Sequence, residues 1–141
     1  MTALIHQEYP IAAEDYTRAG EASADIKRRL KQLGVSSMVL RRVAVASYEV
    51  ELNLVIHSRG GVLTLEVEPD RVRLVSRDVG PGIPDVELAM REGYSTATDN
   101  IRTLGFGAGM GLPNMKRNAD QFAIQSAVGV GTTIEMSFCL Q

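Results

Sequence analysis

Three polar residues are spaced so that their side chains share one face of a helix, and their types suit phosphate chemistry. Glu49, Asn53 and His57 follow one another at intervals of four residues, beside an apolar row rather than opposite it. Asn53 offers a carbonyl oxygen of the kind that Mg²⁺ accepts, and Glu49 can accept a proton from a hydroxyl or a water. The alternative is an exposed polar stripe that ends in a structural histidine. Glu51 points elsewhere on the same helix, and we expect it to be solvated.

A second candidate is the segment "DVGPGIPD", which begins at Asp78 directly after an alternating, strand-like run. Gly80 and Gly82 lack side chains, so a flat group can approach the backbone closely there. The Asp78 carboxylate could then accept a hydrogen bond from the exocyclic amine of a purine. The alternative is a tight turn, which the pair Pro81-Gly82 would explain by itself.

A third candidate is the glycine-rich segment "GFGAGMGLPNMKRNAD", in which a loose loop runs directly into a helix. Glycines permit positive φ, and a helix that begins after such a loop directs free N–H groups and its positive dipole end outward. These features favour an anion, most often a phosphate. The spacing matches neither a P-loop nor a Rossmann fingerprint. A merely flexible loop is the alternative.

The elements that must position these residues follow from periodicity and from turn residues. Helical spacing of apolar residues predicts a helix capped by Ser36 that closes at Gly60-Gly61, and Gly34 looks like the stop of the helix before it. Alternation around Pro69-Asp70 and around the turn "GVG" predicts two hairpins. In chain order we expect a strand over 3–9, helices over 14–34 and 37–59, a hairpin over 62–78, a short helix over 85–93, a helix over 112–120 and a hairpin over 122–140. This order predicts an α/β (α+β) sandwich of two layers, with a mixed, mostly antiparallel sheet and helices on one face.

Length and composition limit the alternatives. A chain of 141 residues is the size of one domain, and we treat 1–141 as a single domain. Its net charge of −2 gives no overall positive field, so nucleic acid is not an expected partner. No apolar run is long enough to span a membrane. Cys139 is unpaired, lies in an apolar run and is expected to be buried, which fits a reducing cytoplasm.

Taken together, the motifs resemble the Bergerat ATP-binding fold shared by DNA gyrase, histidine kinases and MutL. The resemblance rests on four motifs in order: Glu-x-x-x-Asn, Asp-x-Gly-x-Gly, the glycine loop before a helix, and the late "GTT" at 131–133. It implies ATP and Mg²⁺, with Glu49 as the general base, Asn53 as the magnesium ligand and Asp78 as the acceptor for the adenine amine. It also implies a nucleotide-binding role for Gly80 and Gly82 as the wall of the adenine pocket, for Gly105, Gly107, Gly109, Met110, Gly111 and Leu112 in the phosphate loop, and for Thr133, in preference to Thr132, at the base pocket.

Within that superfamily the words "GPGIPDVELAMREGYST" and "LGFGAGMGLPNMKR" are similar to the stand-alone serine kinases of bacterial partner switching, the anti-sigma factors and the stressosome switch kinase. The resemblance implies a serine/threonine protein kinase that phosphorylates a small antagonist of the sulfate-transporter/anti-sigma-antagonist (STAS) type. Some such proteins also hold a sigma factor, and many pair with themselves. Two alternatives stay open. One is an ATP-binding module that sequesters a regulator with little turnover. The other is a histidine-kinase-like ATPase domain, although 101–104 lacks the phenylalanine typical of that branch.

Overall fold

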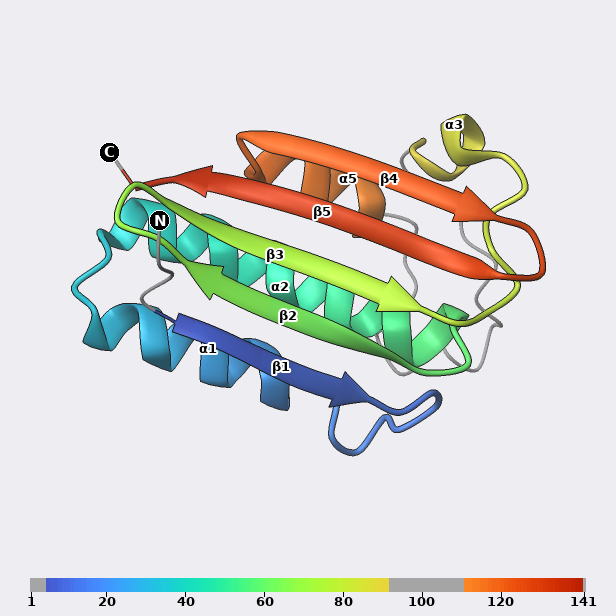
Figure 1. Cartoon of the computed structure of the whole chain (residues 1–141), viewed down its shortest axis with the longest axis horizontal. Coiled ribbons are helices and arrows are strands. Elements are labelled where there is room, and N and C mark those ends of the chain that lie inside the picture. The colour runs from blue at the N-terminus through green and yellow to red at the C-terminus, as the bar shows by residue number, and fades with distance from the viewer. Residues whose placement is uncertain (1–4, 92–110, 141) are drawn as a thin grey trace.

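The protein folds into one sheet covered by helices on one face (Figure 1). In this computed structural model the described residues are 5–91 and 111–140. The strands are β1 (Ile5–Ile11), β2 (Gly61–Val67), β3 (Arg71–Asp78), β4 (Gln121–Ala127) and β5 (Gly131–Cys139), and the helices are α1 (Glu21–Gln32), α2 (Ser37–His57), α3 (Val86–Ala89) and α5 (Gly111–Asn118). The strand order is β1-β2-β3-β5-β4. The two-layer prediction is confirmed, and every pairing among the described strands is antiparallel rather than mixed.

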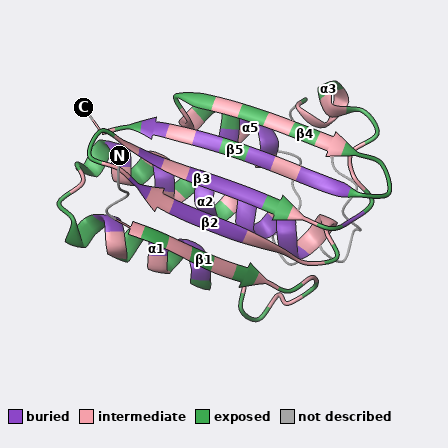
Figure 2. Ribbon diagram, viewed as in Figure 1, coloured by how far each residue is buried: buried purple, intermediate pink, exposed green. Residues whose placement is uncertain are grey.

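The core lies between the sheet and the long helix α2. The apolar residues whose helical spacing predicts α2 are buried: Val39, Val43, Ala46, Val50 and Leu54. Alternate residues of the inner strands face them, as the buried even-numbered positions of β5 from Thr132 to Phe138 show (Figure 2), whereas in β3 Leu74, Val75 and Ser76 are buried in succession. Because side chains alternate along a strand, this pattern also fixes which strand residues point toward the helices and which lie on the open face.

The signals for the ends of the helices are confirmed in part. The Ser36 hydroxyl accepts a hydrogen bond from the Val39 N–H at 3.4 Å, so the predicted cap of α2 is present. Gly34 has φ of 80° and ends α1, with the Val35 N–H donating to the Leu30 carbonyl at 3.2 Å, which is the Schellman pattern. The opening strand, in contrast, runs past the predicted stop and includes Pro10. β1 is an edge strand, where a proline is tolerated.

Two predictions about the first helix and about Glu51 are wrong for one shared reason. α1 begins at Glu21 rather than at residue 14, after Gly20 with φ of 101°. Glu51 is only 1% exposed, and its carboxylate accepts hydrogen bonds from the N–H groups of Gly20 (2.9 Å), Ala22 (3.2 Å) and Ser23 (2.9 Å). Those N–H groups have no partner within the helix, and the positive end of the helix dipole favours a carboxylate. Glu51 from α2 therefore determines where α1 starts.

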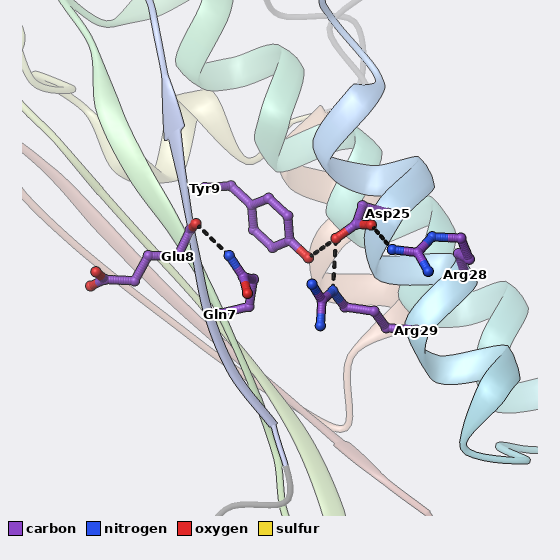
Figure 3. Close-up of polar contacts among 6 residues, drawn as sticks. All are labelled: Gln7, Glu8, Tyr9, Asp25, Arg28 and Arg29. Atoms are coloured by element: carbon purple, nitrogen blue, oxygen red, sulfur yellow. Dashed lines mark hydrogen bonds and ion pairs between the residues drawn. The ribbon is translucent and has the colours of Figure 1, made fainter.

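A second polar contact joins α1 to the edge strand β1 (Figure 3). The Tyr9 hydroxyl donates to Asp25 Oδ2 at 2.6 Å, the Arg29 Nε donates to the same oxygen at 2.8 Å, and Arg28 pairs with the other carboxylate oxygen. The hydrogen bonds from Tyr9, Arg29 and Arg28 hold the pKa of Asp25 well below its usual range. Asp25 is therefore ionised at neutral pH and ties the edge of the sheet to the helix layer.

Cys139 corrects another expectation, because it is exposed rather than buried. It is the last residue of β5, where the odd-numbered positions face away from the helices. Among the described residues, no helix is both long enough and apolar enough to span a membrane.

We predict that Glu51→Leu lowers the free energy of unfolding by about 2 to 4 kcal/mol, because buried N–H groups at the start of α1 lose their acceptor. Urea unfolding at neutral pH measures this change. Glu21→Gln is the matched control on α1, since Glu21 is exposed and its substitution should change the free energy by less than about 0.5 kcal/mol. Equal stability of Glu51→Leu and the native chain would contradict the capping role.

Candidate functional site

The predicted base, Glu49, lies where α2 meets the start of α5. Its Oε2 atom is 3.4 Å from the point that a Cβ on Gly111 would occupy, and Gly111 is the first residue of α5. The side-chain amide of Asn114, one turn further along α5, also interacts with Glu49. The Glu49 carboxylate therefore lies beside the N-terminal end of a helix that directly follows the glycine-rich segment.

Burial and the Asn114 amide act on Glu49 in opposite directions. Burial raises the pKa of Glu49, and the hydrogen bond from Asn114 lowers it. A half-buried carboxylate with a raised pKa, facing a helix end, has the character of a functional group rather than of a solvated surface residue. Asn114 was not selected from the sequence. The feature of the sequence that could have identified Asn114 is its amide side chain in the first helical turn after the glycines.

Asn53 and His57 continue the same row along α2. Asn53 is half-buried one turn beyond Glu49, and His57 is the last residue of the helix. Burial lowers the pKa of His57, which favours its neutral form and agrees with a structural role. Among the described residues, no three His, Cys, Asp or Glu side chains are grouped to hold a metal. An amide oxygen one helical turn from a carboxylate still fits Mg²⁺, which takes few protein ligands and completes its shell with waters and phosphate oxygens.

Asp78, the predicted purine acceptor, is the last residue of β3 and lies beside the start of β5. Its Oδ1 accepts a hydrogen bond from the Thr132 N–H at 3.0 Å. Burial raises the pKa of Asp78, and the Thr132 N–H lowers it. Within residues 5–91 and 111–140, Oδ2 is the carboxylate oxygen that remains open to another donor.

The register separates the two candidate threonines. Thr132 is 6% exposed and shares the helix side of β5 with Ile134. Thr133 is the next residue and therefore points to the open face, where it pairs with Arg77. The Thr132 hydroxyl is also 2.8 Å from Ser126 Oγ, which accepts from the Ile83 N–H at 2.7 Å. The structure therefore brings Thr132 to Asp78, and it does not bring Thr133 there.

The glycines around Asp78 allow backbone segments to approach one another. Gly82 has φ of 74°, and a Cβ there would overlap the carbonyl group of Ala127. A Cβ on Gly131 would overlap the Asp78 carbonyl. Gly80 donates to the Val130 carbonyl at 3.1 Å, and a Cβ on it would lie 3.3 Å from the Cα of Ser58. The turn after β3 is thus held between the C-terminal end of α2 and the β4-β5 hairpin.

These contacts place the two parts of the candidate site, one around Glu49 and one around Asp78, at different points along α2. Glu49 faces the start of α5, while Ser58, directly after the end of α2, lies against the Asp78 turn. Nine residues of helix correspond to roughly 13 Å, which an extended nucleoside triphosphate can bridge. A cavity of about 560 Å³ opens elsewhere, between β1 and the start of α1, and none of the predicted site residues lines it.

The glycine-rich segment itself is described only at its end. Gly105, Gly107, Gly109 and Met110 lie outside the described residues. Gly111 opens α5, one residue before the predicted start at residue 112, and Leu112 is buried in the core. The Leu112 side chain therefore packs against the other core residues, and only its backbone is available to a ligand.

We predict that Glu49→Gln raises the free energy of unfolding at neutral pH. Because burial raises the pKa of Glu49, the folded chain holds this proton more tightly than the unfolded chain, so stability falls as the pH rises through the folded pKa. Glutamine is neutral and escapes this loss. Urea unfolding without nucleotide or Mg²⁺ should show the advantage of Glu49→Gln at pH 7 and none below about pH 4.

Glu135→Gln, on the open face of β5, is the control for that measurement, because Glu135 is exposed. The same gain at pH 7 in both variants would show that a general charge effect, and not the burial of Glu49, is responsible.

Comparisons with known proteins agree with this geometry. Residues 40–141 match the family described as histidine kinase-, DNA gyrase B-, and HSP90-like ATPase. The serine/threonine-protein kinase RsbT of Bacillus subtilis (strain 168) is 33% identical over 109 residues, covering 74% of this chain and 76% of that protein. The anti-sigma F factor of Geobacillus stearothermophilus is 30% identical over 109 residues, with 73% and 71% covered. That of Bacillus licheniformis is 30% identical over 114 residues, with 77% and 75% covered. Since the family match covers most of α2, the turn that follows Asp78, α5 and the last hairpin, the chain belongs to the histidine kinase-, DNA gyrase B-, and HSP90-like ATPase family.

Proposed function

We propose that this protein is an ATP-dependent serine/threonine protein kinase of the switch-kinase and anti-sigma type. The observation that carries the proposal is the placement of Glu49 against the start of α5, on the helix whose far end adjoins Asp78. The names of the relatives, a serine/threonine-protein kinase and anti-sigma F factors, support the same class.

In this proposal the chain's own residues hold both ends of the nucleotide. Asp78 Oδ2 accepts from the adenine amine, while Gly80 keeps the adjoining backbone accessible. The N–H groups at the start of α5, with Gly105, Gly107, Gly109, Met110, Gly111 and Leu112, hold the phosphates by their backbone. Asn53 would be the protein ligand of Mg²⁺, which when bound offsets negative charge on the phosphates.

Glu49 acts as the general base. A serine or threonine hydroxyl of the protein substrate attacks the γ-phosphorus of ATP, and Glu49 takes the proton of that hydroxyl. The bond between the γ-phosphorus and the bridging oxygen breaks, so that ADP leaves with the electron pair. The raised pKa of Glu49 suits a base, because a more basic carboxylate accepts a proton more readily.

The proposed substrate is a small antagonist with a STAS-type domain, and the proposed location is the cytoplasm. A sigma factor or another regulator is a second proposed partner, and we include pairing of the chain with itself in the proposal. We also treat residues 1–141 as one nucleotide-binding domain. A module that binds ATP to sequester a regulator, with little turnover, needs the same pocket and is distinguished only by activity.

Glu49→Ala should retain binding of ATP and ADP while losing phosphoryl transfer by about 100-fold or more, because the loss of a general base typically costs that much. Incubation with γ-labelled ATP, Mg²⁺ and STAS-type proteins encoded in the same genome measures transfer, and calorimetry measures binding. Unchanged labelling in Glu49→Ala would remove Glu49 from its role. Binding without labelling by the native chain would favour the sequestering module, and no heat with ATP or ADP would exclude both.

The two threonines supply a prediction with a built-in control. Thr132→Val should weaken ADP binding by about tenfold, because the Thr132 hydroxyl belongs to the polar group beside Asp78. Thr133→Val, one residue later on the open face, should change it by less than about twofold. Calorimetry on both variants decides the matter, and the reverse order would restore Thr133 as the residue of the base pocket.

A further inference from the structure

An arginine on α2 holds the far end of α5. The Arg42 Nε donates to the backbone carbonyl of Asn118 at 2.8 Å, and its Nη2 pairs with Asp120 Oδ1 at 3.0 Å. Asn118 is the last residue of α5, where carbonyl groups lack partners within the helix and where the dipole favours a cation. One guanidinium therefore satisfies the end of α5 and the acid that follows it.

Asp120 extends this connection into the sheet. Its Oδ2 accepts from the Cys139 N–H at 2.7 Å, and its own N–H donates to the Ser137 carbonyl at 2.9 Å. The hydrogen bonds from the Cys139 N–H and from Arg42 lower the pKa of Asp120, so that it stays ionised. Arg42 thus joins α2 both to α5 and, through Asp120, to β5.

The same pair of helices meets again at the candidate active site, in matching register. Arg42 and Glu49 are seven residues apart on α2, and their partners on α5, Asn118 and Gly111, are also seven residues apart in the opposite direction. The two helices are therefore antiparallel, and each of these intervals spans roughly 10 Å. Fixing Asn118 opposite Arg42 is geometrically equivalent to fixing Gly111 opposite Glu49. A slip of one turn would move Gly111 by about 5 Å.

We propose that Arg42 is a positioning residue for phosphoryl transfer, because its fork on Asn118 and Asp120 sets the register that places the start of α5 against Glu49. It does not touch the nucleotide. The catalytic part of this inference rests on the proposed kinase function, whereas the structural part does not. Arginine is required because its planar guanidinium donates to the Asn118 carbonyl and to the Asp120 carboxylate at the same time. A lysine ammonium keeps the positive charge but lacks the two-pronged geometry.

The test compares Arg42→Gln and Arg42→Lys with Arg73→Gln. Arg73 pairs with Glu66 at 3.1 Å on the open face of the sheet, and the side chains of that pair are 28% and 27% exposed, close to the 30% and 34% of Arg42 and Asp120. The control therefore loses a comparable ion pair without touching α5. All three variants should fold, since such pairs contribute about 1 kcal/mol or less, and thermal unfolding verifies this.

The first measurement uses the protein alone. Amide hydrogen exchange in α5 should become about fivefold faster in both Arg42 variants, because the C-terminal end of the helix is released. The amide resonance of Gly111 should also move in both, although Gly111 lies two helical turns from the substitution. Arg73→Gln should show neither effect. Native exchange in α5 and an unmoved Gly111 resonance in Arg42→Gln would overturn the inference.

The second measurement separates positioning from simple stability. In both Arg42 variants kcat for transfer from ATP should fall by about 10-fold to 100-fold, while affinity for ADP changes by less than about threefold, since small misplacement of reacting groups is enough for such a loss. Restoration of kcat by Arg42→Lys would show that only charge matters and would overturn the inference. If the native chain transfers phosphate to no substrate, the proposed function fails, and the exchange and resonance data alone then decide the role of Arg42.

Discussion

α2 places two carboxylates against the N-terminal ends of the helices on either side of it, and the stability of the fold depends on one of them, Glu51. Glu51 lies at the start of α1, and Glu49 lies at the start of α5. Two successive odd positions on a helix are about 200° apart around its axis, so one helix can serve both neighbours while its inner face packs on the sheet. Each contact joins a negative side chain to a positive helix end.

The two carboxylates differ in how much of their hydrogen-bonding capacity the fold itself uses. Glu51 accepts three backbone hydrogen bonds and is almost completely buried, so its bonding capacity is used for structure. Glu49 is half-buried, and the only interaction described for its carboxylate within 5–91 and 111–140 is with Asn114. A carboxylate that is desolvated but incompletely satisfied is suited to accept a proton during a reaction. Although they are only two residues apart on α2, Glu51 is therefore a structural acid and Glu49 a candidate catalytic one.

The sequence correctly predicts those features of the fold that depend only on residues close together in the chain. The buried face of α2, the Ser36 cap, the Gly34 stop and both hairpins follow from spacing and turn chemistry within short stretches, and the structure has all of them. The start of α1 was mispredicted because its cap comes from Glu51, thirty residues later in the chain. The exposure of Cys139, and the position of Thr132 rather than Thr133 beside Asp78, depend on which residues of β5 face the helices. A shift of one residue in that assignment moves every side chain of the strand to the opposite face of the sheet. Asn114 was missed because its contact with Glu49 exists only once α2 and α5 have packed together.

Pro10, in the edge strand β1, has a consequence for how molecules of this protein meet one another in concentrated solution. An outer strand offers a row of unpaired backbone groups onto which a foreign strand can add. A proline in an edge strand disfavours such addition, because it has no N–H to donate. The inner edge of β1 is paired with β2. Its outer edge is a poor template for open-ended, fibre-like growth.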